Sequence, residues 1–192
     1  MGYRKLAVLS CCAPCSCGAI KHLVDQGVEV TVIFYNPNIF PQAEYEKRRD
    51  EQARVCRALG ADFVELPYEP ACWEEAVRGL EHEPERGKRC SVCFYMRLKK
   101  AQQYAKAHGF EALTSVLGVS RYKDLNQVNA AARKAWAQTG KPYWAKDWRK
   151  GGLEELRRAL VKEFNLYQQT YCGCKYSLSN SQGHDKPGEH EK

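Results

Sequence analysis

The 192-residue sequence has no apolar run long enough to cross a membrane, and its 44% hydrophobic content is typical of soluble globular proteins. A short apolar stretch precedes Cys11, as in a lipoprotein signal, but it is too short for the hydrophobic region of a signal peptide. Internal repeats are also absent. We therefore expect one soluble domain without a membrane partner.

Phosphate-binding loops are missing as well. No segment matches the GxxxxGK[ST] or GxGxxG patterns, whose glycine amides surround phosphates. A pyrophosphatase-type SGGxDS loop would follow the first predicted strand, but residues 10–15 read SCCAPC. Since the glycine amides are absent, we expect no ATP-dependent chemistry.

Cysteine, in contrast, is abundant, and its spacing is informative. Secreted disulfide scaffolds spread their cysteines through loop-rich chains, whereas here they are clustered between regular, helix-rich segments. This pattern favours a metal or redox site in a reducing, cytoplasmic setting. The ten cysteines comprise three groups and two isolated residues: Cys11, Cys12, Cys15 and Cys17; Cys90 and Cys93; Cys172 and Cys174; Cys56; Cys72.

Hydrophobic patterning predicts strands that alternate with helices. The strands are expected at Leu6–Leu9, Val28–Tyr35, Asp62–Tyr68, Phe110–Val119 and Pro142–Ala145. This order is typical of an α/β protein, here a single-domain, Rossmann-like, three-layer fold with a mainly parallel sheet of about five strands and helices on both faces. We expect the domain to span residues 1–177, with a metal site at the carboxyl ends of the strands, and residues 178–192 to form a disordered polar tail.

Two cysteine groups are predicted to begin helices. Cys11, Cys12 and Cys15 follow the first strand, and Cys90 and Cys93 open a helix after several basic residues. Helix N-termini and positive charge both lower thiol pKa values. Four thiolates from two loops match the needs of a structural zinc or a cubane cluster. Adjacent cysteines favour iron–sulfur over zinc, although a vicinal disulfide beside an unrelated CxxC remains an alternative.

Cys172 and Cys174 flank Gly173 near the end of the predicted domain. Thiols one residue apart can close only a strained, easily reduced disulfide, and glycine supplies the backbone freedom that it requires. Such a bond suits electron relay better than stabilisation. The alternative is a pair of free thiols in a turn.

A net charge of +7 favours a polyanionic partner such as RNA. Basic and aromatic residues interleave in the predicted loops on the cysteine side of the sheet, where the aromatic rings could stack on unpaired bases. This candidate RNA surface comprises Lys88, Arg89, Arg97, Lys99, Lys100, Arg121, Lys123, Lys146, Arg149 and Lys150, with Tyr122, Tyr143, Trp144 and Trp148.

Four segments together resemble the cobalamin-independent epoxyqueuosine reductases: SCCAPC, FYNPNIFP, EPERGKRCSVCFYMRL and YCGCKYS, in this order, between Leu6 and Ser177. The resemblance implies removal of the epoxide oxygen of epoxyqueuosine at the tRNA wobble position. The partners it implies are tRNA carrying this nucleoside and an unidentified electron donor.

The same resemblance assigns residues to the chemistry. It implies a 4Fe-4S cluster on Cys11, Cys12, Cys90 and Cys93, and a redox-active disulfide between Cys172 and Cys174. It also implies a second, mononuclear iron, for which Cys15 is the candidate ligand. Asp147 and Tyr35, expected near strand ends, are candidate proton donors.

Two other functions fit part of the pattern. A tRNA sulfur-transfer enzyme on a similar sheet would use a cysteine persulfide and normally ATP. A zinc-stabilised RNA-binding protein would need the four thiolates but would catalyse no reaction.

Overall fold

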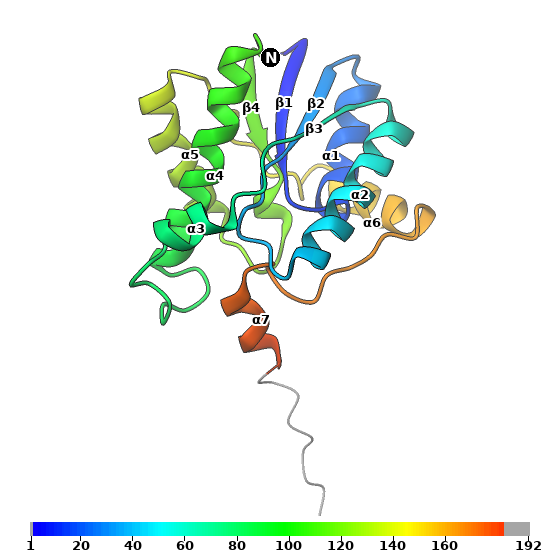
Figure 1. Ribbon diagram of the computed structural model, residues 1–192. Helices are drawn as coiled ribbons and strands as arrows, with labels where there is room; N and C mark the ends of the chain where they lie inside the picture. The colour runs from blue at the N-terminus through cyan, green and yellow to red at the C-terminus, as the bar shows by residue number, and fades with distance from the viewer. Residues whose placement is uncertain (1, 183–192) are drawn as a thin grey trace, which may run out of the picture.

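The computed structural model describes residues 2–182 of the chain, with side chains through residue 178. Twelve elements follow one another along this part of the chain (Figure 1): β1 (Lys5–Ser10), α1 (Ala13–Asp25), β2 (Glu29–Phe34), α2 (Gln42–Leu59), β3 (Asp62–Glu65), α3 (Pro70–Ala76), α4 (Lys88–Ala107), β4 (Ala112–Ser115), the 3₁₀ helix η1 (Leu117–Val119), α5 (Leu125–Thr139), α6 (Leu153–Glu163) and α7 (Lys175–Gln182).

The four strands form one parallel sheet in the order β3-β2-β1-β4. Leu9 of β1 lies opposite Ile33 of β2 and Ser115 of β4, so the three strands end near one another. Figure 1 shows α1, α2 and α6 on one side of the sheet, and α4 and α5 on the other. The predicted α/β class, with helices on both faces, is confirmed.

Strand β1 is central because its side chains suit burial on both faces. Leu6, Ala7, Val8 and Leu9 are all 0% exposed, as are Val32, Ile33 and Phe34 of the neighbouring β2. Continuous apolar runs of this kind are typical of parallel strands covered by helices on both sides. The core thus holds the carboxyl end of β1, where the first cysteines begin, in a fixed position.

The expected fifth strand is wrong. Within residues 142–145, only Tyr143 forms a bridge, to Leu113 of β4, and it is parallel. The Pro142 carbonyl oxygen accepts a hydrogen bond from the Leu113 amide. Because Pro142 lacks an amide hydrogen, it cannot donate a hydrogen bond that would extend the ladder. The fourth strand is also shorter than predicted, because the chain turns into η1 directly after Val116.

The expected tail boundary also requires correction. Helix α7 continues through Gln182, so residues 178–182 are helical, while residues 183–192 lie outside the described part of the chain. The start of α7 is packed against the domain: the Tyr176 ring lies 6.0 Å from that of Trp73 and 4.7 Å from the Arg89 guanidinium. These contacts supply apolar and cation–π stabilisation that the polar composition did not predict.

Helix α6 packs closely against the start of α1. A Cβ atom on Gly18 would lie 3.1 Å from the Leu153 carbonyl oxygen and 3.2 Å from the Arg157 Cα, so only glycine allows this approach. Arg157 then reaches over α1 and donates from Nη1 to the Pro14 carbonyl oxygen at 3.2 Å. The contact places α6 beside the cysteine loop.

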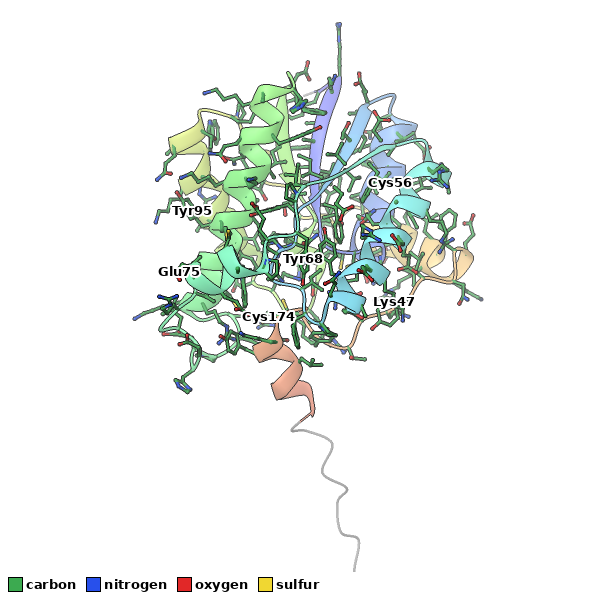
Figure 2. The ribbon with its side chains drawn as sticks, in the orientation of Figure 1. Lys47, Cys56, Tyr68, Glu75, Tyr95 and Cys174 are labelled. Carbon is green, nitrogen blue, oxygen red and sulfur yellow. The ribbon has the colours of Figure 1, made fainter. Side chains whose placement is uncertain are left out.

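Over residues 2–182, no helix has the length and apolar character needed to span a membrane. Several cysteines within the helices, among them Cys17 of α1 and Cys56 of α2, are packed in the core. Cys56 of α2 is 0% exposed, and Figure 2 shows it well away from Cys174 at the lower edge of the molecule. Burial raises the pKa of Cys56 to about 12, even though Gln52 donates a hydrogen bond to its sulfur.

This shift predicts a pH-dependent stability. The Cys56 thiol ionises at about pH 9 in the unfolded chain but only near pH 12 in the folded protein. Below pH 9 both states keep the thiol protonated, and its contribution to the free energy of unfolding is complete. Above pH 9 the unfolded state is stabilised by ionisation, so this contribution is lost as the pH rises towards 12. Between pH 9 and 10.5 the loss is about 2 kcal/mol at ~1.4 kcal/mol per pH unit. Cys56→Ala should be about 1 kcal/mol less stable than wild type at pH 7.5, through lost packing, but should lose less stability at pH 10.5.

Urea unfolding of both proteins at the two pH values, with reductant present, measures the difference. The difference in free energy of unfolding between wild type and Cys56→Ala should change by about 2 kcal/mol in favour of the variant from pH 7.5 to pH 10.5. Exposed Cys72→Ala is the matched control, and its gap should stay constant. A constant gap for Cys56→Ala would show that the Cys56 thiol is not protected from ionisation.

Candidate active site

The first cysteine loop is held between β1 and α2. The Gln52 side-chain oxygen accepts hydrogen bonds from Ser10 Oγ at 2.7 Å and from Ser16 Oγ at 2.9 Å. The Cys12 amide donates back to Ser10 Oγ at 3.3 Å. One buried glutamine thus fixes both ends of the loop. Sequence reasoning missed Gln52, because a polar residue in a charged helix gives no signal of burial.

Three thiols meet in this loop. The sulfurs of Cys11 and Cys12 are 3.9 Å apart, and Cys15 lies within hydrogen-bond reach of both. Thiol hydrogen bonds from Cys12 and Cys15, together with the charges of Lys123 and Arg97, hold the pKa of Cys11 well below its usual range. The same coupling raises the pKa of Cys12 to about 12 and that of Cys15 well above its ordinary value. The loop therefore favours one thiolate, on Cys11.

The CxxC cysteines open α4, as predicted. Cys90 accepts a hydrogen bond from the Arg86 amide at 3.3 Å, and burial raises its pKa to about 11. Cys93, one turn further, lies against Trp73 and Arg97, and burial raises its pKa despite the positive charge of Arg97. Arg97 interacts with both Cys93 and Cys11, so it joins the two cysteine groups.

Two buried cations face the thiols. Arg97 is 0% exposed. Its Nε donates to the Tyr35 carbonyl oxygen at 3.2 Å and its Nη2 donates to Asn36 Oδ1, while its Nη1 has no hydrogen-bond partner among the described residues. Lys123 is 5% exposed, and its Nζ lies 3.7 Å from Cys11 Sγ. Burial alone would lower the pKa of Lys123, but the charges of Cys11, Cys172 and Cys15 raise it above its ordinary value.

Neither cation has a carboxylate partner within residues 2–182, and each acts on the other as a like charge. Burying an unpaired ion costs several kcal/mol. Negative charge at the neighbouring sulfurs would therefore stabilise both cations. Arg97 had a sequence signal, since it follows Cys93 by four residues on the same helical face. Lys123 had none.

A C-terminal segment closes over the cysteine loop. Arg48 of α2 is 1% exposed and paired with Glu44 at 2.6 Å; it donates to the carbonyl oxygens of Tyr171 and Cys172 at 3.4 and 3.2 Å. Gly173 has φ +126°, and a Cβ there would lie 3.1 Å from Arg48 Nη1. This backbone conformation and the close approach of Arg48 both favour glycine at position 173.

This segment brings further groups to the thiols. Gln169 donates from Nε2 to Cys12 Sγ at 2.9 Å. Cys172 lies close enough to Cys90, Cys93, Cys174 and Lys123 to influence the pKa of each, so it neighbours both the CxxC cysteines and the lysine beside Cys11. Both Cys172 and Cys174 are free thiols, and burial raises the pKa of Cys174 to about 12. The structure thus assembles three cysteine groups from sequence positions more than 150 residues apart.

The candidate proton donors have other partners. The Tyr35 hydroxyl donates to Glu69 at 3.1 Å, and burial and Glu69 raise its pKa. Asp147 accepts from the Arg149 side chain at 2.9 Å, which lowers the Asp147 pKa. Within the described residues, neither side chain forms a hydrogen bond to a cysteine sulfur.

Five of the fourteen residues of the candidate RNA surface are buried, which corrects that part of the prediction. Arg89, Arg97 and Lys123 are at most 5% exposed. Trp148 is 3% exposed and donates to Thr114 Oγ1, because residues 142–148 cover the edge of the sheet. Tyr122 lines the same cavity as Cys15; its hydroxyl donates to the Thr170 carbonyl oxygen, and the Arg121 guanidinium lies 5.0 Å from its ring.

The cysteines differ in how well they suit a single metal ion and a cluster. Within residues 2–182, no three His, Cys, Asp or Glu side chains are arranged to hold a single metal ion. The thiolates of a four-iron cluster stand farther apart than the ligands of one ion, and such a cluster with its thiolates is anionic. Cys11, Cys12, Cys90 and Cys93, around two unpaired cations, fit that requirement chemically.

Comparison with known proteins identifies relatives over most of the chain. The family model for epoxyqueuosine reductase QueH matches residues 6–180. The chain is 44% identical to epoxyqueuosine reductase QueH of Haemophilus influenzae over 181 residues, 94% of this chain and 74% of that protein. It is 34% identical to the Thermotoga maritima protein of the same name over 171 residues, 88% of this chain and 87% of that protein.

Two solved structures share the fold at low sequence identity. A predicted tRNA methyltransferase subunit from Methanocaldococcus jannaschii has a TM-score of 0.56 at 14% identity, covering 83% of this chain and 74% of that one. The U34-tRNA thiolase NcsA of Methanococcus maripaludis, with its [4Fe-4S] cluster, has a TM-score of 0.56 at 12% identity, covering 94% and 64%. The sequence relatives confirm the resemblance. The chain belongs to the epoxyqueuosine reductase QueH family of oxidoreductases.

Proposed function

We propose that this protein deoxygenates epoxyqueuosine at the tRNA wobble position, using an iron–sulfur cluster held by Cys11, Cys12, Cys90 and Cys93. The observation that carries the proposal is the pair of buried cations, Arg97 and Lys123, which face these thiols without a carboxylate partner within residues 2–182. An anionic thiolate-bound cluster would neutralise them. When bound, such a cluster supplies one-electron transfer and Lewis acidity.

The reaction balances with a dithiol as reductant. Loss of the epoxide oxygen as water breaks two C–O bonds, forms a C=C bond, and consumes two electrons and two protons. Oxidation of Cys172 and Cys174 to a disulfide releases two electrons and two protons. Gly173 gives the backbone the freedom for ring closure. An external electron donor then reduces the disulfide for the next turnover.

Two further assignments complete the proposal. Cys15 is assigned to a second iron, because it borders both the Cys11–Cys12 pair and an open cavity. Protons are assigned to the dithiol rather than to Tyr35 or Asp147, whose side chains are bonded to Glu69 and Arg149. A tRNA substrate places the protein in the cytoplasm, and nothing in this scheme uses ATP.

Serine variants distinguish a cysteine that holds the cluster from a cysteine that forms the redox-active disulfide. Cys90→Ser should abolish both the cluster and activity, because serine is a poor iron ligand. Cys172→Ser should retain the iron, sulfide and broad absorption of the wild type but lose multiple turnover, since a single thiol cannot form the disulfide. Iron and sulfide content, spectra and deoxygenation of epoxyqueuosine tRNA measure these outcomes.

Exposed Cys72→Ser is the control and should behave as wild type. Full activity in Cys90→Ser or Cys172→Ser would contradict the role assigned to that cysteine. A colourless protein holding about one zinc, with no cluster after anaerobic reconstitution, would contradict the redox function as a whole and favour an RNA-binding module.

The cation next to Cys11 should tune the reduction potential. Lys123→Met removes a buried positive charge 3.7 Å from Cys11 Sγ, so adding an electron nearby becomes harder. We expect a midpoint potential lower by on the order of 100 mV, measured by redox titration of the anaerobic protein. Lys99→Met, a substitution in the outer part of α4, should leave the potential unchanged. An unchanged potential in Lys123→Met would place the cluster away from Cys11.

A further inference from the structure

A cavity of about 570 Å³ opens beside the cysteine loop. Its walls come from the start of α1, the loop after η1, the first turns of α6 and the C-terminal segment, and include Cys15, Tyr122, Glu154, Arg157, Gln169 and Thr170. Its volume lies within the range of pockets that enclose a small organic ligand. In Figure 1, the elements that form it meet near the lower edge of the sheet, where the strands end.

The inner wall of this cavity is continuous with the thiols. Cys15 lines it directly, and Gln169 lines it while donating from Nε2 to Cys12 Sγ at 2.9 Å. Among the described residues, the other end of that amide, Oε1, has no hydrogen-bond partner and is itself shielded from solvent. A buried, unpaired carbonyl oxygen is costly. Because Gln169 also lines the cavity, a small shift of its side chain would let a hydroxyl or amine donor in the cavity bond to this oxygen close to the sulfurs.

The outer wall carries an aromatic ring and a guanidinium. Arg121 lies 5.0 Å from the Tyr122 ring and donates to the Tyr122 hydroxyl at 2.9 Å. The hydroxyl in turn donates to the Thr170 carbonyl oxygen, which ties the ring to the C-terminal segment. Tyrosine rings and arginine planes are the groups on which unstacked bases lie.

The opposite wall is rigid before any ligand enters. Arg157 is paired through Nη2 with Glu154 at 2.7 Å and donates from Nη1 to the Pro14 carbonyl oxygen at 3.2 Å. Its Cβ and Cα would lie 3.1 and 3.2 Å from a Cβ on Gly18. Because this wall is locked to α1, the distance between the outer platform and the thiols is set by the fold.

The geometry points to this cavity as the site that receives the unstacked wobble nucleoside, with its base against Tyr122 and Arg121 and the epoxide-bearing group beside Gln169 and Cys15. Gln169 is then a positioning residue that binds a polar group of the modification and holds it near the sulfurs. This inference rests on the proposed function for the identity of the substrate. Placement of an unpaired RNA base in the cavity can be tested separately.

The test measures binding of anaerobic holoprotein to fluorescent anticodon stem–loops with epoxyqueuosine or guanosine at the wobble position. Tyr122→Ala should weaken binding of both RNAs about tenfold, as expected for a lost base-stacking contact, while Tyr122→Phe should bind within about twofold of wild type. Unchanged binding in Tyr122→Ala would overturn placement of the base in this cavity.

Gln169→Met tests the positioning role. It should lower the preference for the epoxyqueuosine stem–loop over the guanosine stem–loop about tenfold, as expected for the loss of a buried hydrogen bond. Affinity for the guanosine stem–loop should change little, and in turnover assays KM should rise more than kcat falls. Gln103→Met, on the exposed side of α4, is the control. An unchanged preference would overturn the role of Gln169.

Two controls separate the possible failures. Iron content and the absorption spectrum are measured for every variant. If Gln169→Met loses its cluster, it is compared with Gln169→Glu after matched reconstitution. Glutamate keeps an acceptor oxygen but replaces the donor group with a second oxygen. A wild-type protein that binds both stem–loops equally would contradict the proposed substrate, whereas the response of Tyr122→Ala would still decide whether the cavity receives a base.

Discussion

The site depends on placing positive charge beside sulfur in the protein interior. Arg97 and Lys123 are buried next to Cys11 and Cys93. Their burial has a desolvation free energy that no carboxylate within residues 2–182 offsets. The sheet makes this possible, because β1 ends between β2 and β4, and the loops that follow all three strands meet there. This positive charge helps to lower the pKa of Cys11, whereas burial keeps the pKa of Cys90 and Cys93 raised. An anionic group bound by these thiols would be stabilised by the same charges. Charge balance therefore links the fold to the proposed chemistry.

The C-terminal segment covers the cysteine loop, although it lies far from that loop in the sequence. Arg48 binds two successive carbonyl groups, at Tyr171 and Cys172, and the lack of a side chain on Gly173 allows the backbone to pass close to it. The same segment contributes Gln169 to the sulfurs and to the wall of the cavity. Cys172, Gln169 and part of the cavity wall thus share one short stretch of backbone, so its anchoring affects all three of the roles proposed for them.

Several features could be predicted from local sequence because their causes are local. Apolar β-branched runs such as Val30–Phe34 have few alternatives to a buried strand, and the CxxC at Cys90 begins a helix as its surroundings indicated. The fifth strand was wrong because a single bridge at Tyr143 depends on its partner across the sheet. The tail boundary was wrong because α7 is held by contacts of Tyr176 with Trp73 and Arg89, which composition does not encode locally.

The sequence by itself determined the α/β class, the cysteine groups and, through four ordered motifs, the family. Tertiary structure alone decided which charged residues are buried: Lys123 is indistinguishable in sequence from the surface lysines around it, yet its ammonium lies 3.7 Å from Cys11. It also decided that Gln52 supports the cysteine loop and that Gln169 leaves one oxygen unpaired. The reason is physical. Strand patterns and motifs are short-range properties of the chain, whereas burial and electrostatic environment arise only when distant segments pack together.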